Sequence, residues 1–143
     1  MALLIAPSWP PFGPAPWTAP WTARGPLRDA TVVACSTAQA GTVPYMMMAD
    51  LGAEVIKIET PDGGVPSRQV NVAAGFPGRY FETDNRGVKS VTLNLKTAAG
   101  QSILHRLIAR ADLFGQNFRP KAAEKNCFGY DGLKKIGPKR VYL

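Results

Sequence analysis

The sequence has few of the residues that build metal centres or disulfide frameworks. Its 143 residues include two cysteines and a single histidine. Cys35 and Cys127 lie far apart, and neither belongs to a CxxC motif or a Cys/His cluster. We therefore predict neither a disulfide framework nor a metal site. His105 falls outside the apolar stripe of its segment, which predicts a surface position.

Long hydrophobic runs are also missing. No apolar stretch approaches the roughly 20 residues needed to cross a bilayer, so we expect no membrane partner. The net charge of +7 suits a phosphate-rich ligand or simple solubility and does not choose between them. The basic residues are spread along the chain without a recognition motif, so we expect no nucleic-acid partner. Because the sequence shows no obvious targeting signal, we expect a cytoplasmic protein, with mitochondria and peroxisomes as open alternatives.

Residues 1–27 differ in composition from the rest of the chain. They hold all three tryptophans, seven of the 13 prolines and the tandem repeat APWTAPWTA. We interpret this segment as an irregular extension, because proline opposes helices and interrupts strands. The remaining residues, 28–143, have the length of one domain with a real core.

From residue 28 onward, strand-like and helix-like segments alternate. Apolar or β-branched runs predict strands at 31–35, 53–59, 91–95, 111–117 and 140–143. Helices are expected at 42–51, after a Thr97 cap, at 121–127 and at 131–136. The run TVVAC does not alternate, which is typical of a parallel strand covered on both faces. The pattern predicts an α/β fold, a Rossmann-like doubly wound parallel sheet.

Such a sheet binds ligands beyond the carboxyl ends of its strands. The loops STAQAG, ETPDGG and QNFRPK each follow a predicted strand. Neither GxGxxG nor GxxxxGK[ST] occurs, so the standard dinucleotide fingerprint and the P-loop are both missing. From the residues alone, the site is no more specific than a nucleotide-like ligand.

Five longer motifs, in order and spacing, carry a family resemblance. They are AQAG, ADLGAEVIKIE, NRGVKSVTLNLKTAAG, ADLFGQNFRP and FGYDGLKKIGPKRVY. Together they resemble the amino-terminal part of class III CoA-transferases, the relatives of formyl-CoA transferase and carnitine CoA-transferase. The resemblance covers most of residues 26–143. It implies that the chain stops before the second domain of a two-domain enzyme that works as an interlocked homodimer.

The resemblance implies transfer of CoA from an acyl-CoA to a carboxylic acid, with CoA as a substrate and no permanently bound cofactor. In the family, an aspartate attacks the thioester to give a mixed anhydride and then an aspartyl-CoA thioester. The first loop would approach this reaction centre, which places Gln39, Ala40 and Gly41 there. Gln39 would donate to an oxyanion, and the two small residues would allow close backbone approach.

The other loops would hold the nucleotide end of CoA. Asn117 matches a family asparagine whose side-chain amide can hydrogen-bond adenine or ribose. Arg119 has the guanidinium geometry for a bidentate phosphate contact. Arg68, Arg86 and Lys89 are further phosphate candidates. Lys57 and Glu59 are left without a ligand role, and we interpret Glu59 as a brace for the loop that follows it.

Several departures from the family pattern bear on function. Val88 stands where the family commonly has a basic residue, and Asn126 and Cys127 stand where Leu-Gly is common. The family's catalytic aspartate lies beyond the position of Leu143, so we predict no catalytic residue within this sequence. An α-methylacyl-CoA racemase, which shares the fold, and a non-catalytic CoA-binding module remain as alternatives.

Overall fold

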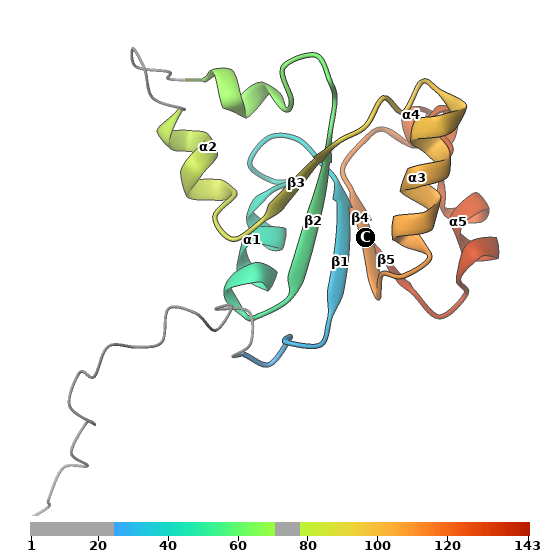
Figure 1. The fold of residues 1–143 in the computed structure, drawn as a ribbon, viewed down its shortest axis with the longest axis horizontal. Helices are drawn as coiled ribbons and strands as arrows, with labels where there is room; N and C mark the ends of the chain where they lie inside the picture. Colours follow the sequence, from blue (N-terminus) through green and yellow to red (C-terminus); the bar gives the residue numbers. More distant parts are fainter. Residues whose placement is uncertain (1–24, 71–77) are drawn as a thin grey trace, which may run out of the picture.

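The structure is a computed structural model that describes residues 25–70 and 78–143, built around a parallel sheet with helices on both faces (Figure 1). The strands are β1 (Thr31–Cys35), β2 (Glu54–Glu59), β3 (Lys89–Thr92), β4 (Leu113–Gln116) and β5 (Val141–Tyr142). The helices are α1 (Val43–Asp50), α2 (Arg79–Asp84), α3 (Ala98–Ile108), α4 (Pro120–Lys125) and α5 (Tyr130–Ile136), with a 3-10 turn, η2 (Pro66–Gln69).

The strand order is β3-β2-β1-β4-β5, and every neighbouring pair is parallel. The chain adds strands to one side of β1 and then returns to add β4 and β5 on the other side. This order confirms the predicted doubly wound α/β fold. It also creates a topological switch point between β1 and β4, where loops leave in opposite directions.

The central strand β1 explains why its sequence does not alternate. Val32 and Ala34 belong to a core cluster with residues of α1, whereas Val33 and Cys35 belong to a second cluster with residues of α3, α4 and α5. All four side chains are at most 2% exposed. Burial also raises the pKa of the Cys35 thiol to about 12, so this cysteine is a packing residue rather than a nucleophile.

Local features of the sequence account for two helix ends. Thr97 caps α3, because its Oγ1 accepts a hydrogen bond from the Gly100 N–H at 3.1 Å. Gly52 follows α1 with φ +101°, in the left-handed region that favours glycine. Thr42 occupies the cap position of α1, but its hydroxyl donates back to the Ala38 carbonyl at 2.9 Å and does not cap the helix.

The third strand is shifted relative to its prediction. It was expected at 91–95, and it begins and ends earlier, at Lys89 and Thr92. The reason is its edge position, where only Val91 packs against the core. Leu93 and Leu95 pack against the same cluster from the loop beyond the strand. Because Leu93 and Leu95 are apolar and alternate with polar residues, the sequence looked like a strand up to residue 95. Helix α2 and the 3-10 turn η2 were not predicted from the sequence.

Candidate functional site

The switch point between β1 and β4 is closed by a pair of hydrogen bonds. The Asn117 side-chain amide donates to the Thr37 carbonyl at 2.7 Å, and its Oδ1 accepts from the Thr37 N–H at 2.9 Å. A Cβ added at Gly41 would collide with the Asn117 amide and with the Thr37 carbonyl. Gly41 therefore leaves the space that Asn117 fills. These three residues fix the loop after β1 against the loop after β4.

A cavity of about 230 Å³ opens at the carboxyl ends of the strands. Its walls come from residues that follow four different strands, and a segment after α4 completes them. The lining includes Ser36, Thr37, Ile58, Thr60, Gly64, Val65, Leu93, Asn94, Lys96, Phe118, Asn126 and Phe128. In an open α/β sheet this is the position at which ligands bind. Most of the lining is apolar, as is usual for a site that holds a small molecule.

Two polar side chains distinguish the cavity from an ordinary packing defect. The Asn126 amide donates to the Ala122 carbonyl at 2.8 Å, and its Oδ1 takes part in no hydrogen bond with the described residues. Ser36 is 1% exposed, and its hydroxyl has no hydrogen-bond partner among the described residues. Buried polar groups without partners are uncommon in native proteins and call for an explanation. Phe118, which is 37% exposed, adds an aromatic ring at the rim.

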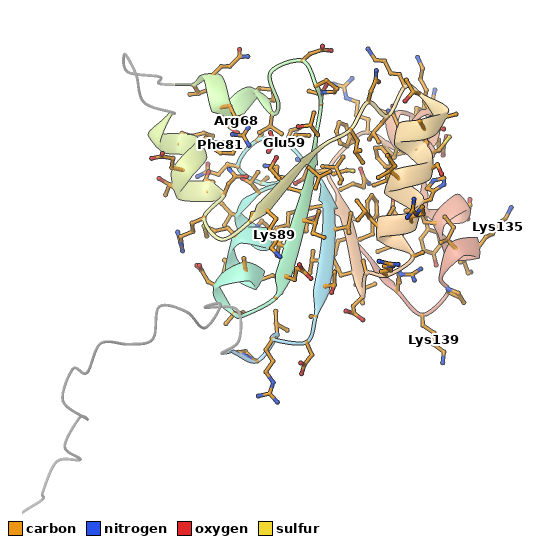
Figure 2. All side chains as sticks on the ribbon, in the orientation of Figure 1. Glu59, Arg68, Phe81, Lys89, Lys135 and Lys139 are labelled. Carbon is orange, nitrogen blue, oxygen red and sulfur yellow. The ribbon has the colours of Figure 1, made fainter. Side chains whose placement is uncertain are left out.

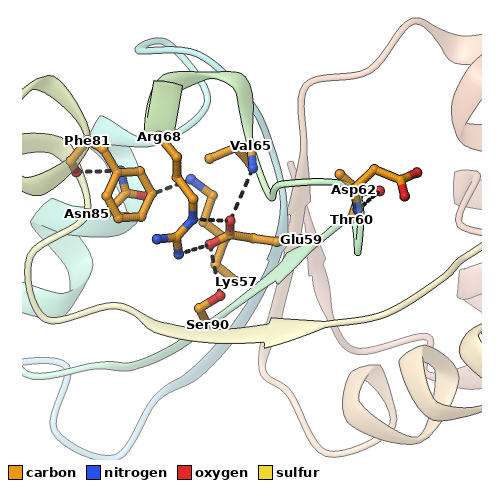
Figure 3. Close-up of polar contacts among 9 residues, drawn as sticks. All are labelled: Lys57, Glu59, Thr60, Asp62, Val65, Arg68, Phe81, Asn85 and Ser90. Atoms are coloured by element: carbon orange, nitrogen blue, oxygen red, sulfur yellow. Dashed lines mark hydrogen bonds and ion pairs between the residues drawn. The ribbon is translucent and has the colours of Figure 1, made fainter. Parts of the chain in front are cut away.

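The loop between β2 and η2 is braced by a buried carboxylate (Figure 3). Glu59 is 3% exposed and accepts hydrogen bonds from the Val65 N–H at 3.1 Å and the Ser90 hydroxyl at 2.8 Å. Arg68 donates to it through Nε and Nη2, both at 2.7 Å. Burial raises the pKa of Glu59, but these hydrogen bonds outweigh burial and lower it. The interpretation of Glu59 as a brace is confirmed.

Lys57 lies beside this brace and is 2% exposed (Figure 3). Its Nζ donates to the Asn85 Oδ1 at 2.6 Å, and it lies 5.9 Å from the centre of the Phe81 ring. Burial lowers the pKa of Lys57 to about 8, which the nearby Glu59 partly offsets. Arg68 covers the same ring at 3.8 Å. The two cations join β2 and η2 to α2.

The predicted phosphate contacts lie in different environments. Arg68 is held by Glu59, Arg86 forms an ion pair with Asp50, and Lys89 forms one with Glu54. None of these three cations lines the cavity. Their role in ligand binding stays a prediction.

Arg119 is different from the other three candidates. It is exposed, directly follows the cavity residue Phe118, and forms no side-chain hydrogen bond or ion pair with the described residues. Its backbone lies at the start of α4, where its carbonyl accepts from the Ala122 and Ala123 N–H groups. Its contact with a phosphate stays a prediction.

The loop after β1 presents an exposed backbone turn. Gln39 and Ala40 are exposed, whereas Gly41 is buried against Asn117. The Gln39 carbonyl accepts from the N–H groups of Thr42 and Val43 at 3.0 and 3.1 Å, which ties the turn to the start of α1. The side chain of Gln39 is left at the surface. Its predicted contact with an oxyanion is not tested by this geometry.

Comparison with known proteins identifies the family of this fold. A family model described as CoA-transferase family III matches residues 27–143. The chain belongs to CoA-transferase family III.

Curated relatives carry names that describe CoA transfer. The acetyl-CoA:oxalate CoA-transferase of Acetobacter aceti is 34% identical over 119 residues, which cover 83% of this chain and 31% of the relative. The probable fatty acyl-CoA transferase Rv3272 of Mycobacterium tuberculosis is 41% identical over 108 residues, 72% of this chain and 27% of the relative. The chain thus spans about 30% of the length of these transferases.

Solved structures share the fold as well as the sequence. A CAIB/BAIF family protein from Brucella suis matches with a TM-score of 0.76 and 33% identity, over 83% of this chain and 32% of that protein. The M. tuberculosis protein Rv3272 matches with a TM-score of 0.75 and 37% identity, over 82% of this chain and 32% of that protein. Sequence and structure comparisons therefore agree on the family.

None of the eight candidate site residues predicted from the sequence lines the cavity. Gly41 and Asn117 nevertheless support the loop after β1, which supplies the lining residues Ser36 and Thr37. The loop after β3, which supplies Asn94 and Lys96, was not considered as part of the site. The rule that ligands bind at carboxyl ends applies to this loop as well and would have found it. Among the described residues there is no metal-binding group of side chains and no helix able to span a membrane.

Proposed function

We propose that this family III chain binds the nucleotide end of CoA in the cavity at the carboxyl ends of β1 and β2. The main support is the position of the cavity beside the switch point between β1 and β4, where Asn117 and Gly41 fix the two loops against each other. Phe118 offers a face on which a base can stack, and the free Oδ1 of Asn126 offers an acceptor. A pocket with apolar walls and a few polar atoms suits a purine.

With the base in the cavity, the phosphates of the bound CoA would extend out of it toward exposed cations. Lys96 lines the cavity and Arg119 follows the rim residue Phe118, so both are placed to meet a phosphate. The pantetheine arm would then run toward the exposed turn at Gln39 and Ala40. In this proposal, Arg68 supports the site through Glu59 and does not touch the ligand.

The reaction proposed for the protein is CoA transfer from an acyl-CoA to a free carboxylic acid. Its relatives are named for acetyl-CoA with oxalate and for succinate with glutarate, which makes these pairs the first substrates to try. CoA acts as a substrate, and no permanently bound cofactor is proposed. We further propose that the protein works as a homodimer in the cytoplasm.

Because no catalytic residue is predicted within residues 1–143, CoA binding is tested on the 143-residue chain, and transfer of CoA from acetyl-CoA to radiolabelled oxalate, or from succinyl-CoA to radiolabelled glutarate, is tested on the full-length gene product. Appearance of labelled acyl-CoA supports the proposal. Solvent deuterium that enters the α-carbon of a 2-methylacyl-CoA, without transfer, supports a racemase instead. CoA binding without either reaction supports the alternative of a non-catalytic CoA-binding module. The absence of CoA binding refutes the proposed site.

A further inference from the structure

A second hollow, of about 540 Å³, borders the segment that closes the proposed CoA cavity. Along this segment, Asn126 and Phe128 line the cavity, whereas Cys127 and Gly129 line the second hollow. No described residue lines both spaces. The walls of the second hollow come from α3, β4, α4, α5 and β5. Its volume falls within the range of roughly 300–1,000 Å³ that is usual for small-molecule sites.

Two side chains of the hollow hold this segment by its backbone. His105 Nε2 lies 2.8 Å from the Cys127 carbonyl oxygen, and the Tyr142 hydroxyl donates to the Phe128 carbonyl at 3.1 Å. Because a carbonyl oxygen can only accept, Nε2 of His105 carries the proton, and Nδ1 of the neutral ring is then an acceptor. The wall that separates the two spaces is therefore fixed by groups of the second hollow.

The charge of the hollow is opposite to that of its surroundings. Residues 105–143 hold nine Lys or Arg and three Asp or Glu, a net charge of +6. Two of these three acids, Glu124 and Asp131, line the hollow, whereas no described Lys or Arg does. Neither carboxylate takes part in a hydrogen bond or ion pair with the described residues. The hollow is therefore acidic within the most basic part of the chain.

Nearby cations are engaged elsewhere or point away. Arg140 donates to two backbone carbonyls beside β4, both at 2.6 Å. Figure 2 shows Lys135 and Lys139 projecting away from the body of the molecule. The Nζ of Lys134 lies over the ring of Tyr130, 5.7 Å from its centre. The two carboxylates are thus left without a basic partner that the structure describes.

Helix electrostatics account for only one of the two acids. Asp131 lies in the first turn of α5, where a negative charge is favourable. Glu124 lies in the last turn of α4, where a negative charge is unfavourable. A Cβ added at Gly129 would lie 3.1 Å from Glu124 Cγ, so the stem of Glu124 lies across this glycine at the wall of the hollow. The stability of α4 does not explain the charge of Glu124.

The rest of the lining combines aromatic and apolar surface. The rings of Tyr130 and Tyr142 meet edge to face, with their centres 5.5 Å apart. Pro120, Ala123 and Ile136 add apolar contact area. Tyrosine faces attract cations, and this attraction adds to that of the carboxylates. The lining suits a molecule that carries a positive group on an apolar body.

We propose that the hollow bounded by α3, α4 and α5 binds a small primary ammonium ion with an apolar body. The ammonium group would pair with the carboxylates of Glu124 and Asp131, and the body would lie against Tyr130 and Ile136. Carboxylate oxygens and His105 Nδ1 accept hydrogen bonds, which favours an ammonium with N–H donors over a quaternary one. Because the two carboxylates repel anions, neither the phosphates of CoA nor a carboxylic acid substrate is the expected occupant.

The test uses the 143-residue chain and three probes with the same phenylethyl body: 2-phenylethylamine, 2-phenylethanol and 3-phenylpropionate. Amide shifts in proton–nitrogen NMR spectra give both the affinity and the residues contacted. The Glu124→Gln/Asp131→Asn variant removes both carboxylates of the hollow. The Asp62→Asn/Glu82→Gln variant is the matched control, because it also removes one Asp and one Glu, both exposed and outside the hollow. Circular dichroism checks that both variants fold.

We expect the amine to shift amides of the hollow and to bind at least about threefold more tightly than the alcohol or the acid. Its affinity should fall about three- to tenfold in the variant of the hollow, change by less than about twofold in the control, and weaken with salt. Equal binding of the three probes, equal losses in the two variants, shifts confined to other surfaces, or no binding at millimolar amine would each overturn the proposal. CoA is titrated in parallel, and since the two spaces share no lining residue, failure of one site is separable from failure of the other.

Discussion

The buried carboxylate of Glu59 accepts hydrogen bonds from Val65, Arg68 and Ser90, and its replacement tests whether these bonds hold the loop between β2 and η2. In Glu59→Gln the negative charge disappears and an NH₂ group faces the donors of Arg68, Ser90 or Val65. Breaking a buried ion pair by removing one partner costs about 3–5 kcal/mol. The Arg68 side chain is 36% exposed, so water recovers part of its charge, and we expect a loss of about 2–4 kcal/mol.

The assay is urea unfolding of the chain at pH 7, followed by fluorescence and circular dichroism. Glu54→Gln is the matched control, because Glu54 also pairs with a cation, Lys89, but the two side chains are 47% and 66% exposed. We expect this control to change the unfolding free energy by less than about 1 kcal/mol. Equal losses in the two variants would refute the conclusion that Glu59 holds the loop.

The pH dependence of the same contact has a definite sign. The pKa of Glu59 is lower in the folded state than its ordinary value. Its stabilising contribution is therefore complete above the unfolded pKa of about 4.3 and is lost as pH falls through the folded pKa. The difference in unfolding free energy between the unchanged chain and Glu59→Gln should shrink as pH falls below that range.

Four further predictions follow from other parts of the structure. The Cys127→Gly variant should be about 0.5–1 kcal/mol more stable in urea unfolding, because Cys127 has φ +62° and glycine accepts this conformation; equal stability would contradict the strain. Gly41→Ala should cost about 1–3 kcal/mol and weaken CoA binding in a titration, since its methyl displaces Asn117. Burial lowers the pKa of Lys57 to about 8, so stability relative to Lys57→Met should rise with pH from about 8 to about 10.5. Asn126→Leu should bind CoA and its hypoxanthine analogue equally, whereas the unchanged chain should prefer CoA by about fivefold, the value of one modest hydrogen bond; the same preference in both would remove Asn126 from base recognition.

The architecture was predictable because most of its signals are local. An apolar run without alternation marked β1 as a strand buried on both faces, and the Thr97 cap placed the start of α3. The shift of β3 was not predictable in this way, because Leu93 and Leu95 lie beyond the strand end and pack, partly buried, against the core cluster that includes residues of α3. Hydrophobicity reports burial and does not by itself report conformation.

The candidate site was less predictable than the fold. The hydrogen bond of Asn117 to adenine or ribose stays a prediction, and its contact with Thr37, which joins residues 80 positions apart, is shown by no local pattern. Arg68 looked like a free cation because its partner Glu59 belongs to another element. The cavity depends on how loops after several strands meet. Phe118 belongs to the loop QNFRPK, which the sequence placed at this edge, whereas Asn126 entered the site only through the three-dimensional arrangement.

The central claim is that CoA occupies the cavity at the carboxyl ends of the strands. It is tested most directly by calorimetric titration of CoA into the 143-residue chain and two variants. Thr60 is exposed and lines the cavity, whereas Asp62 is exposed and does not. The account predicts one CoA per chain, at least about tenfold weaker binding in Thr60→Trp, where the indole fills the mouth, and less than about twofold change in Asp62→Trp. Undiminished binding in Thr60→Trp, or no binding by the unchanged chain, would contradict it.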